Sequence, residues 1–390
     1  MRKQTKAIHT SFAHPDPYGA LSMPVYNSVA YEFDDAQTMS DTFKGLIEEP
    51  DYSRTMNPTV TYLENKVKHI TGASHVTAFN SGMAAISNTL IALSGNGKTI
   101  LTSHHLFGNT VALMNVTLNR FGVRTKKVDL TKPEDVADAM DESVCCIFLE
   151  IMTNPQLEVA PLKMLANIAH KHMVPLVTDS TMIPFTEHQL HKLGVDIELV
   201  SSTKYVSGGA TSLGGLVIDY SAPESFRQSI SQEMLFNLGA YMTPHAAYMQ
   251  TIGLETLHAR YAIQSSNALL LAKKLKSVGQ IKRVGYVGLT DNPYHEIARE
   301  QFGETAGAML TIDLADRKQC FSFINHLKLI KRATNLFDNR TLAIHPASTI
   351  FGNFTDEERR AMDVRDTTIR ISVGLEDVED IFEDIKQALG

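Results

Sequence analysis

Short apolar runs alternate with helix-length segments between residues 75 and 219. Most of the gaps between runs are long enough for a helix, as in 80–95 and 160–173. This alternation predicts an α/β fold with a mostly parallel sheet and helices on both of its faces. The runs predicted as strands are 75–79, 99–102, 123–130, 144–150, 174–179, 197–203 and 213–219.

The pattern changes on either side of this region. Residues 1–60 have no steady hydrophobic period and contain five prolines, which predicts an extended arm. Residues 223–275 predict mainly helix, with one long amphipathic helix over 252–277. Strand-like and helix-like stretches follow to the end of the chain. We therefore expect an arm over 1–60, a large α/β domain over 61–240 and a smaller α+β domain over 241–390.

Composition and charge narrow the class of protein. Apolar residues make up 43% of the chain and charged residues 20%, which is typical of a folded soluble protein. The net charge of −7 argues against a nucleic-acid partner, and no apolar stretch is long enough to span a bilayer. The first residues lack the apolar core of a signal peptide. Cys145, Cys146 and Cys320 make neither a disulfide framework nor a metal pattern, so we expect a reducing cytoplasm.

Three titratable residues fall at predicted strand ends, where ligands bind in parallel sheets. They are Glu150, Asp179 and Lys204. The lysine, flanked by Ser201 and Thr203, could form a Schiff base with an aldehyde. The aspartate could pair with a pyridinium nitrogen, because a buried carboxylate needs a partner. The alternatives are a surface lysine and an aspartate that caps the next helix.

Two further segments could bind a phosphate. Ser81, Gly82 and Met83 begin a predicted helix directly after a strand, where backbone N–H groups and the helix dipole favour an anion. Tyr52 and Arg54 in the arm could also contact a phosphate, with arginine supplying a forked donor. An ordinary helix cap and a solvated loop are the alternatives. Together, these groups call for an aldehyde, a basic aromatic nitrogen and a phosphate on one molecule, and pyridoxal 5′-phosphate has all three.

Many ordered motifs resemble the Cys/Met-metabolism enzymes that use pyridoxal phosphate. This group includes cystathionine γ-synthase, cystathionine γ-lyase, methionine γ-lyase and the O-acylhomoserine sulfhydrylases. The resemblance covers nearly the whole chain and implies the type I PLP-dependent transferase fold, which is aspartate aminotransferase-like. It also implies an amino-acid substrate and a homotetramer built from two dimers. The motifs are YSRTMNPT, FNSGMAAI, LFGNT, TNP (153–155), DST (179–181), SSTKYVSGG, IGLETLHAR (252–260), HPAS (345–348) and IRISVGLEDVEDI (369–381).

The resemblance implies a role for each matching residue. Lys204 matches the Schiff-base lysine and Asp179 the partner of the pyridine nitrogen. Asn154 matches the asparagine near the cofactor's phenolic oxygen, and Arg370 matches the arginine that binds the substrate carboxylate. The phosphate cup is matched by Ser81, Gly82, Met83, Ser201 and Thr203, with Tyr52 and Arg54 matching residues that a neighbouring subunit lends to it.

The chain departs from the family at several positions. Phe107 stands where a tyrosine is usual, so stacking on the cofactor ring survives but a hydroxyl is lost. A thiol, with a pKa of about 8.5, leaves poorly without a proton, whereas a carboxylate, with a pKa of about 4, leaves readily. Asn335 replaces a serine that contacts the substrate carboxylate. Gly209 and Phe351 replace histidines, and the latter is expected to make the rim of the site more apolar.

The missing hydroxyl at position 107 favours one reaction over others. We expect replacement of the acyloxy group of O-acetyl- or O-succinylhomoserine by sulfide or a thiol. The alternative reaction is γ-elimination by a lyase that acts on methionine or cystathionine. A third possibility is a cofactor-binding protein without catalysis, against which Lys204, Asp179 and Arg370 argue.

Overall fold

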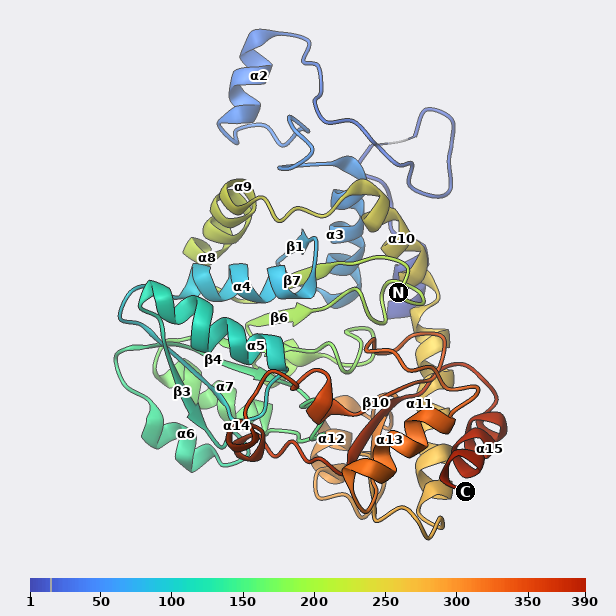
Figure 1. Ribbon diagram of the computed structural model, residues 1–390. Coiled ribbons are helices and arrows are strands. Elements are labelled where there is room, and N and C mark those ends of the chain that lie inside the picture. The colour runs from blue at the N-terminus through green and yellow to red at the C-terminus, as the bar shows by residue number, and fades with distance from the viewer. Residues whose placement is uncertain (15) are drawn as a thin grey trace.

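A seven-stranded sheet lies at the centre of the computed structural model, which describes residues 1–14 and 16–390 (Figure 1). The five strands β3, β2, β4, β5 and β6 are parallel, and β7 and β1 are antiparallel to their neighbours. The predicted mostly parallel sheet is therefore confirmed. In spatial order the strands are β1 (His75–Phe79), β7 (Gly215–Asp219), β6 (Ile197–Val200), β5 (Leu176–Asp179), β4 (Val144–Glu150), β2 (Thr99–Ser103) and β3 (Arg124–Val128).

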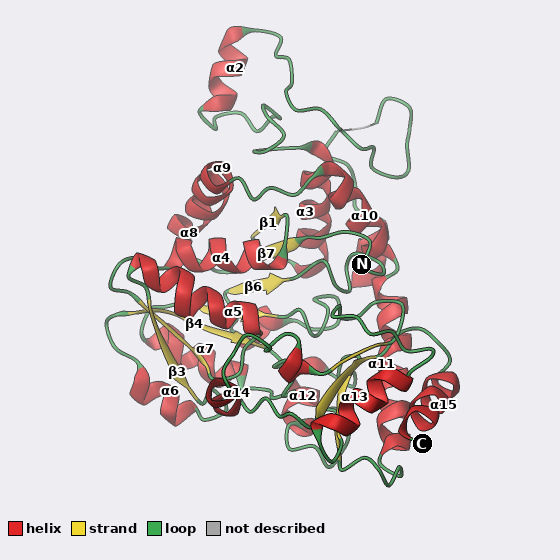
Figure 2. Cartoon of the chain, in the orientation of Figure 1, coloured by secondary structure: helices red, strands yellow, loops and turns green. Residues whose placement is uncertain are grey.

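Helices cover both faces of this sheet (Figure 2). Successive side chains of a strand point to opposite faces, so the continuous apolar run of β4 fills two cores. Cys146 and Phe148 belong to the core that contains residues of α4 (Gly82–Leu93) and α5 (Gly108–Ala112). Ile147 and Leu149 belong to the core with α3 (Pro58–Thr71) and α7 (Leu162–Lys171). The other helices of this part are α6 (Pro133–Ala139), α8 (Glu224–Gln228) and α9 (Leu235–Leu238).

A second, antiparallel sheet lies in the C-terminal part of the chain. Its spatial order is β10 (Leu342–Ile344), β11 (Thr368–Ser372), β9 (Met309–Asp313) and β8 (Arg283–Gly285). The strand-like stretches that the sequence shows at 306–314 and 368–373 contain β9 and β11, but the three-residue strands β8 and β10 are too short to show a period. The helices here are α12 (His295–Phe302), α13 (Arg317–His326), α14 (Asp356–Ala361) and α15 (Val378–Leu389).

The predicted long helix over 252–277 is instead two helices that meet at residue 256. They are α10 (Pro244–Glu255) and α11 (Leu257–Leu275). Arg260 donates from Nη2 to the carbonyls of Gly253 at 2.6 Å and Tyr205 at 2.9 Å, which satisfies a carbonyl left free by the break. A Cβ at Gly253 would lie 2.1 Å from the Val206 carbonyl oxygen, so α10 packs directly on the loop after β6.

The N-terminal arm contains two helices, so the expectation of a wholly extended arm is wrong. α1 (Lys3–Ile8) packs on the body, because Lys3 Nζ donates to the Phe185 carbonyl at 3.0 Å and Ala7 is buried. α2 (Ala36–Phe43) begins at Asp35, whose carboxylate accepts two backbone N–H groups. Figure 1 shows α2 standing away from the rest of the chain.

Membrane-spanning helices and metal-binding clusters are absent from residues 1–14 and 16–390. No helix among them is long and apolar enough to cross a membrane. Within the same ranges, no group of three or more His, Cys, Asp or Glu side chains could hold a metal ion. Cys145, Cys146 and Cys320 are free thiols. Two of the side chains predicted to carry chemistry, Asp179 and Lys204, lie at or just beyond the carboxyl ends of β5 and β6.

Candidate active site

Three titratable residues meet at the carboxyl ends of neighbouring strands. Glu150 ends β4 and lies in register beside Asp179, which ends β5. Lys204 lies in the loop that follows β6, which ends at Val200. The sheet therefore brings these residues together at the edge where the sequence analysis placed a ligand.

Thr181 joins Asp179 to the next strand end. Its N–H donates to Asp179 Oδ1 at 2.9 Å, and its Oγ1 accepts the N–H of Ser201 at 2.8 Å. Burial raises the pKa of Asp179, while the Thr181 bonds and the Lys204 charge oppose that rise. A carboxylate held this way is ready to pair with a cation inside the pocket.

The predicted phosphate cup is formed by two segments that touch. Ser81 caps α4, since its Oγ accepts the Ala84 N–H at 3.1 Å. A Cβ at Gly82 would lie 2.6 Å from Ser201 Cβ, so the N-terminus of α4 lies directly against the loop after β6. Thr203 Oγ1 is bonded to both backbone groups of Gly214, which closes that loop. The structure thus brings together Ser81, Gly82, Met83, Ser201 and Thr203.

Lys204 faces the C-terminal part of the chain across a pocket of about 580 Å³. Its Nζ donates to Asn335 Oδ1 at 2.8 Å. Burial, followed by the charge of Arg370, lowers the pKa of Lys204 to about 8, and the charge of Asp179 opposes both. A lysine with such a pKa is partly neutral near pH 7 to 8, which suits an amine that must act as a nucleophile and a base.

Arg370 is buried on β11 and contacts a second predicted site residue. Its Nη1 donates to Asn154 Oδ1 at 3.2 Å and its Nη2 to the Thr334 carbonyl at 3.1 Å. Its Nε has no hydrogen-bond partner among the described residues. Burial lowers the pKa of Arg370 to about 9, because the guanidinium is held away from water. A buried guanidinium with a spare donor fits a substrate carboxylate.

Glu150 is a site residue that the sequence analysis did not assign. Its Oε1 accepts the N–H of Phe107 and its Oε2 accepts the N–H of Asn154. Burial and then the Asp179 charge raise the pKa of Glu150 to about 8. This side chain therefore fixes the backbone of the two segments that carry Phe107 and Asn154. Its position at the end of a predicted strand is the sequence feature that could have identified it as a site residue.

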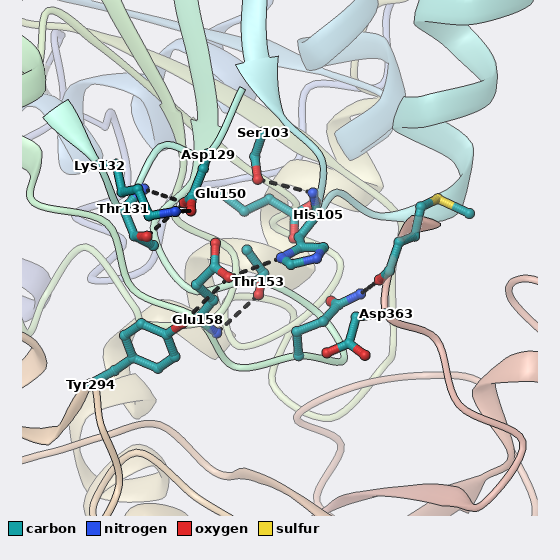
Figure 3. Close-up of polar contacts among 12 residues, drawn as sticks. Ser103, His105, Asp129, Thr131, Lys132, Glu150, Thr153, Glu158, Tyr294 and Asp363 are labelled. Carbon is teal, nitrogen blue, oxygen red and sulfur yellow. Dashed lines mark hydrogen bonds and ion pairs between the residues drawn. The ribbon is translucent and has the colours of Figure 1, made fainter. Parts of the chain in front are cut away.

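A polar cluster beside Glu150 was also missed (Figure 3). His105 Nδ1 lies 2.9 Å from Glu158 Oε2, and the Tyr294 hydroxyl donates to the same oxygen at 3.4 Å. Burial alone would lower the pKa of His105, but Glu158 outweighs burial and raises it. The cluster connects the segment before Phe107 to the C-terminal part of the chain, a link between distant residues that no local sequence pattern shows.

Two predicted features lie elsewhere. Tyr52 and Arg54 line a different pocket from Lys204, where Arg54 Nη1 donates to the Phe236 carbonyl at 2.6 Å. Within one chain, the structure does not bring these two side chains to the phosphate cup. Phe351 is fully buried in the core that contains α4 and α5, so the expectation that it makes the rim more apolar is wrong.

Comparisons with known proteins are consistent with this geometry. Residues 4–390 match the family described as Cys/Met metabolism PLP-dependent enzyme. An L-methionine gamma-lyase of Fusobacterium nucleatum subsp. nucleatum is 36% identical over 395 residues, 99% of this chain and 97% of that protein. An O-acetyl-L-homoserine sulfhydrylase of Corynebacterium glutamicum is 30% identical over 418 residues, 98% of this chain and 95% of that protein.

Solved structures are also similar. A crystal structure assigned as an O-acetylhomoserine (thiol)-lyase of Campylobacter jejuni superposes with a TM-score of 0.96, at 30% identity and with full coverage of both chains. That structure carries N′-pyridoxyl-lysine-5′-monophosphate. The likeness confirms the predicted fold class.

The residues present fit a pyridoxal phosphate ligand. Asp179 offers a buried carboxylate for a ring nitrogen, and Lys204 offers an amine of lowered pKa. Because Gly82 has no Cβ, the N-terminus of α4 and Ser201 adjoin and present backbone and hydroxyl donors together, which suits a phosphate. The roles of the individual residues stay predictions.

Proposed function

Because the chain belongs to the Cys/Met-metabolism family of PLP-dependent enzymes, we propose that it replaces the γ substituent of O-acetyl- or O-succinylhomoserine with sulfide or a thiol. The protein is a pyridoxal-phosphate enzyme that acts on amino-acid substrates, and its relatives include both sulfhydrylases and carbon–sulfur lyases. The finer choice of reaction depends on one observation, the phenylalanine at position 107.

Phe107 supports an acyloxy leaving group. The residue precedes α5 and is half-buried, with its backbone N–H bonded to Glu150. A phenylalanine cannot give a proton to a departing thiol, whose pKa is about 8.5. A departing carboxylate needs no such proton because its pKa is about 4. The lack of a hydroxyl at position 107 should therefore slow the reaction least when the substrate is an O-acylhomoserine.

The surrounding residues fit the early steps that replacement and elimination share. Arg370 would hold the substrate carboxylate through paired charge-assisted bonds. Lys204, partly neutral at its lowered pKa, would take the proton from the α-carbon and then move one from the β-carbon. Asp179 would keep a proton on the ring nitrogen. When bound, pyridoxal phosphate supplies an electron sink for the negative charge that develops at these carbons.

We also propose that the active unit is a homotetramer of two dimers in which Tyr52 and Arg54 reach a neighbouring subunit's phosphate cup. In one chain these side chains lie in a different pocket from Lys204. Large apolar side chains of the arm are exposed, such as Leu21 at 99% and Leu46 at 73%, which is typical of surfaces that another subunit covers. The three free cysteines support a reducing cytoplasm as the location.

A second candidate reaction is γ-elimination from methionine or cystathionine. It is favoured by the 36% identity to an L-methionine gamma-lyase, which exceeds the 30% identity to the O-acetyl-L-homoserine sulfhydrylase. In that reaction the substrate's own thiol is released and no thiol adds at the γ-carbon. Water then hydrolyses the remaining four-carbon unit to a 2-oxo acid and ammonia.

Substrate turnover separates these proposals. We expect O-acetyl- or O-succinylhomoserine with sulfide to give homocysteine faster than methionine or cystathionine alone gives ammonia. Phe107→Tyr is the matched variant, and its restored hydroxyl should raise elimination relative to replacement by about ten-fold or more. Faster elimination by the wild-type enzyme would contradict the proposed reaction. Turnover of none of these substrates would favour a binding protein.

A further inference from the structure

The Asn335 side chain lies between Lys204 and a second carboxylate. Its Oδ1 accepts the bond from Lys204 Nζ at 2.8 Å, and its Nδ2 donates to Asp338 Oδ2 in a long bond of 3.5 Å. An asparagine amide has one donor end and one acceptor end, so a partner at one end decides what the other end presents. Asp338 accepts from the NH₂ end of the amide and so leaves the oxygen end facing Lys204.

Asp338 is itself fixed by Arg340. Its Oδ1 accepts the Arg340 N–H at 3.0 Å and Arg340 Nη1 at 3.2 Å. The carboxylate side chain is only 9% exposed, whereas that of Arg340 is 66% exposed. The second carboxylate oxygen, Oδ2, therefore remains for the Asn335 amide.

The loop that carries Asn335 and Asp338 is held at a set distance from the lysine. The ring of Phe337 stacks on Tyr205, the neighbour of Lys204, with centroids 3.9 Å apart and planes at 10°. The Phe337 N–H also donates to Ser372 Oγ at 2.7 Å. Phe337 keeps a φ of 55°, which a non-glycine residue adopts only when its surroundings hold it there. The spacing from Asp338 to Lys204 is therefore built into the fold.

We propose that Asp338 is a positioning residue that holds the Asn335 amide oxygen toward Lys204 and so favours the protonated form of that amine. A carbonyl oxygen can only accept, and an ammonium group can only donate. Were the amide reversed, its NH₂ end would face Lys204 and favour the neutral amine instead. Asp338 thus works against the burial that lowers the pKa of this lysine.

Other charged groups act on the same amine. Arg370 and Asp179 face Lys204 from β11 and β5, and Lys331 and Arg340 line the same pocket. Two substitutions are therefore expected to act in opposite directions. Asp338→Asn keeps the shape but removes the charge that orients the amide, so the pKa of Lys204 should fall by about one unit. Arg340→Met removes a nearby cation and leaves Asp338 unpaired, so the same pKa should rise.

The pKa of Lys204 can be measured in the full chain after the cofactor has been removed. Trace acetylation with acetic anhydride across pH 6–10, followed by mass spectrometry of the peptide that holds Lys204, gives the titration midpoint. Recovery of visible absorption on adding pyridoxal phosphate checks that each stripped variant is folded. The importance of this inference for catalysis rests on the proposed function. The acetylation midpoint is measured without cofactor, so it tests the role of Asp338 even if the proposed reaction is wrong.

Cofactor uptake gives an independent readout, since only the neutral amine adds to an aldehyde. At pH 7, Asp338→Asn should take up pyridoxal phosphate about five-fold faster, the change in neutral fraction for a pKa that falls from about 8 to about 7. Asn335→Ala tests whether Asp338 acts through the Asn335 amide. In a chain that already carries Asn335→Ala, adding Asp338→Asn should leave the pKa of Lys204 and the rate of cofactor uptake unchanged. An unchanged midpoint in Asp338→Asn, or shifts of the same sign in Asp338→Asn and Arg340→Met, would overturn the proposal.

Discussion

Glu150 and Asp179 are two carboxyl groups in register at the ends of adjacent strands, and the pKa of each is raised by burial. When Asp179 is ionised beside a ring nitrogen, its charge makes ionisation of Glu150 harder still. Glu150, with a pKa of about 8, is therefore mostly protonated at neutral pH while it accepts the N–H groups of Phe107 and Asn154. A glutamine matches the charge of this protonated state, but its amide nitrogen cannot accept a bond, so one of the two backbone N–H groups loses its partner.

The raised pKa of Glu150 predicts how Glu150→Gln changes stability with pH. The unfolded glutamate has a pKa near 4.5 and the folded one about 8, so between these values the folded state binds the extra proton. The free energy of unfolding of the wild type therefore falls as pH rises from about 4.5 to 8 because of this group, and the variant lacks that fall. Thermal unfolding should be measured for both proteins from pH 5 to pH 9. The free energy of unfolding of the variant relative to that of the wild type should rise up to about pH 8 and stay constant above it. A difference that is constant over this range would contradict the raised pKa.

At the scale of elements, the ends of β4 and β5 were predictable, but the strand predicted over 197–203 ends at Val200 and leaves Lys204 in the following loop. The contacts between the strand ends were not predictable. The apolar run at 144–150 coincides with β4, so the position of Glu150 followed from the sequence. The break at residue 256 did not, because the amphipathic pattern continues through it. It depends on Arg260 reaching Gly253 and on α10 packing against a distant loop. The bonds from Glu150 to the segments of Phe107 and Asn154 are likewise tertiary.

The contact between α4 and the loop after β6 gives a further prediction. Gly82→Ala would place a Cβ 2.6 Å from Ser201 Cβ and 2.9 Å from its Cα, and this backbone cannot yield cheaply. Overpacking of this kind costs about 1–3 kcal/mol, so we expect the affinity for pyridoxal phosphate to fall ten-fold or more. Gly95→Ala, with nothing within 4 Å of its Cβ, is the control and should leave affinity unchanged. Titration of the visible absorption would measure both, and equal affinities would refute the close approach as a cofactor determinant.

For the whole molecule, the arm is the part whose role a single chain does not explain. α1 is bonded to the body, yet Tyr52 and Arg54 line a pocket separate from Lys204. The residue types alone suggested that these two side chains contact a phosphate, whereas only the family resemblance assigned them to a neighbouring subunit's site. If they complete a neighbouring subunit's site, then defects on different chains should compensate for one another.

Mixed subunits would test this sharing. Lys204→Ala and Arg54→Ala should each be nearly inactive alone, the first because it lacks the amine. Denatured together and refolded one to one, half of the dimers would be hybrids in which one site receives both intact residues. Turnover should then recover to about a quarter of the wild-type value, on the assumption of random pairing of equal chains. No recovery above the separate variants would place Arg54 in the same chain's site or outside the site altogether.

The small sheet has its last strand in sequence, β11, between β10 and β9. That sheet cannot close until residues 368–372 have left the ribosome, and the antiparallel pairing of β9 must wait for them. Arg370 lies on β11 and is therefore also synthesised late. A nascent chain can therefore complete the large sheet before the small one. If Arg370 binds the substrate as proposed, the substrate pocket is completed only when synthesis is almost finished, and a prematurely terminated product should be inactive.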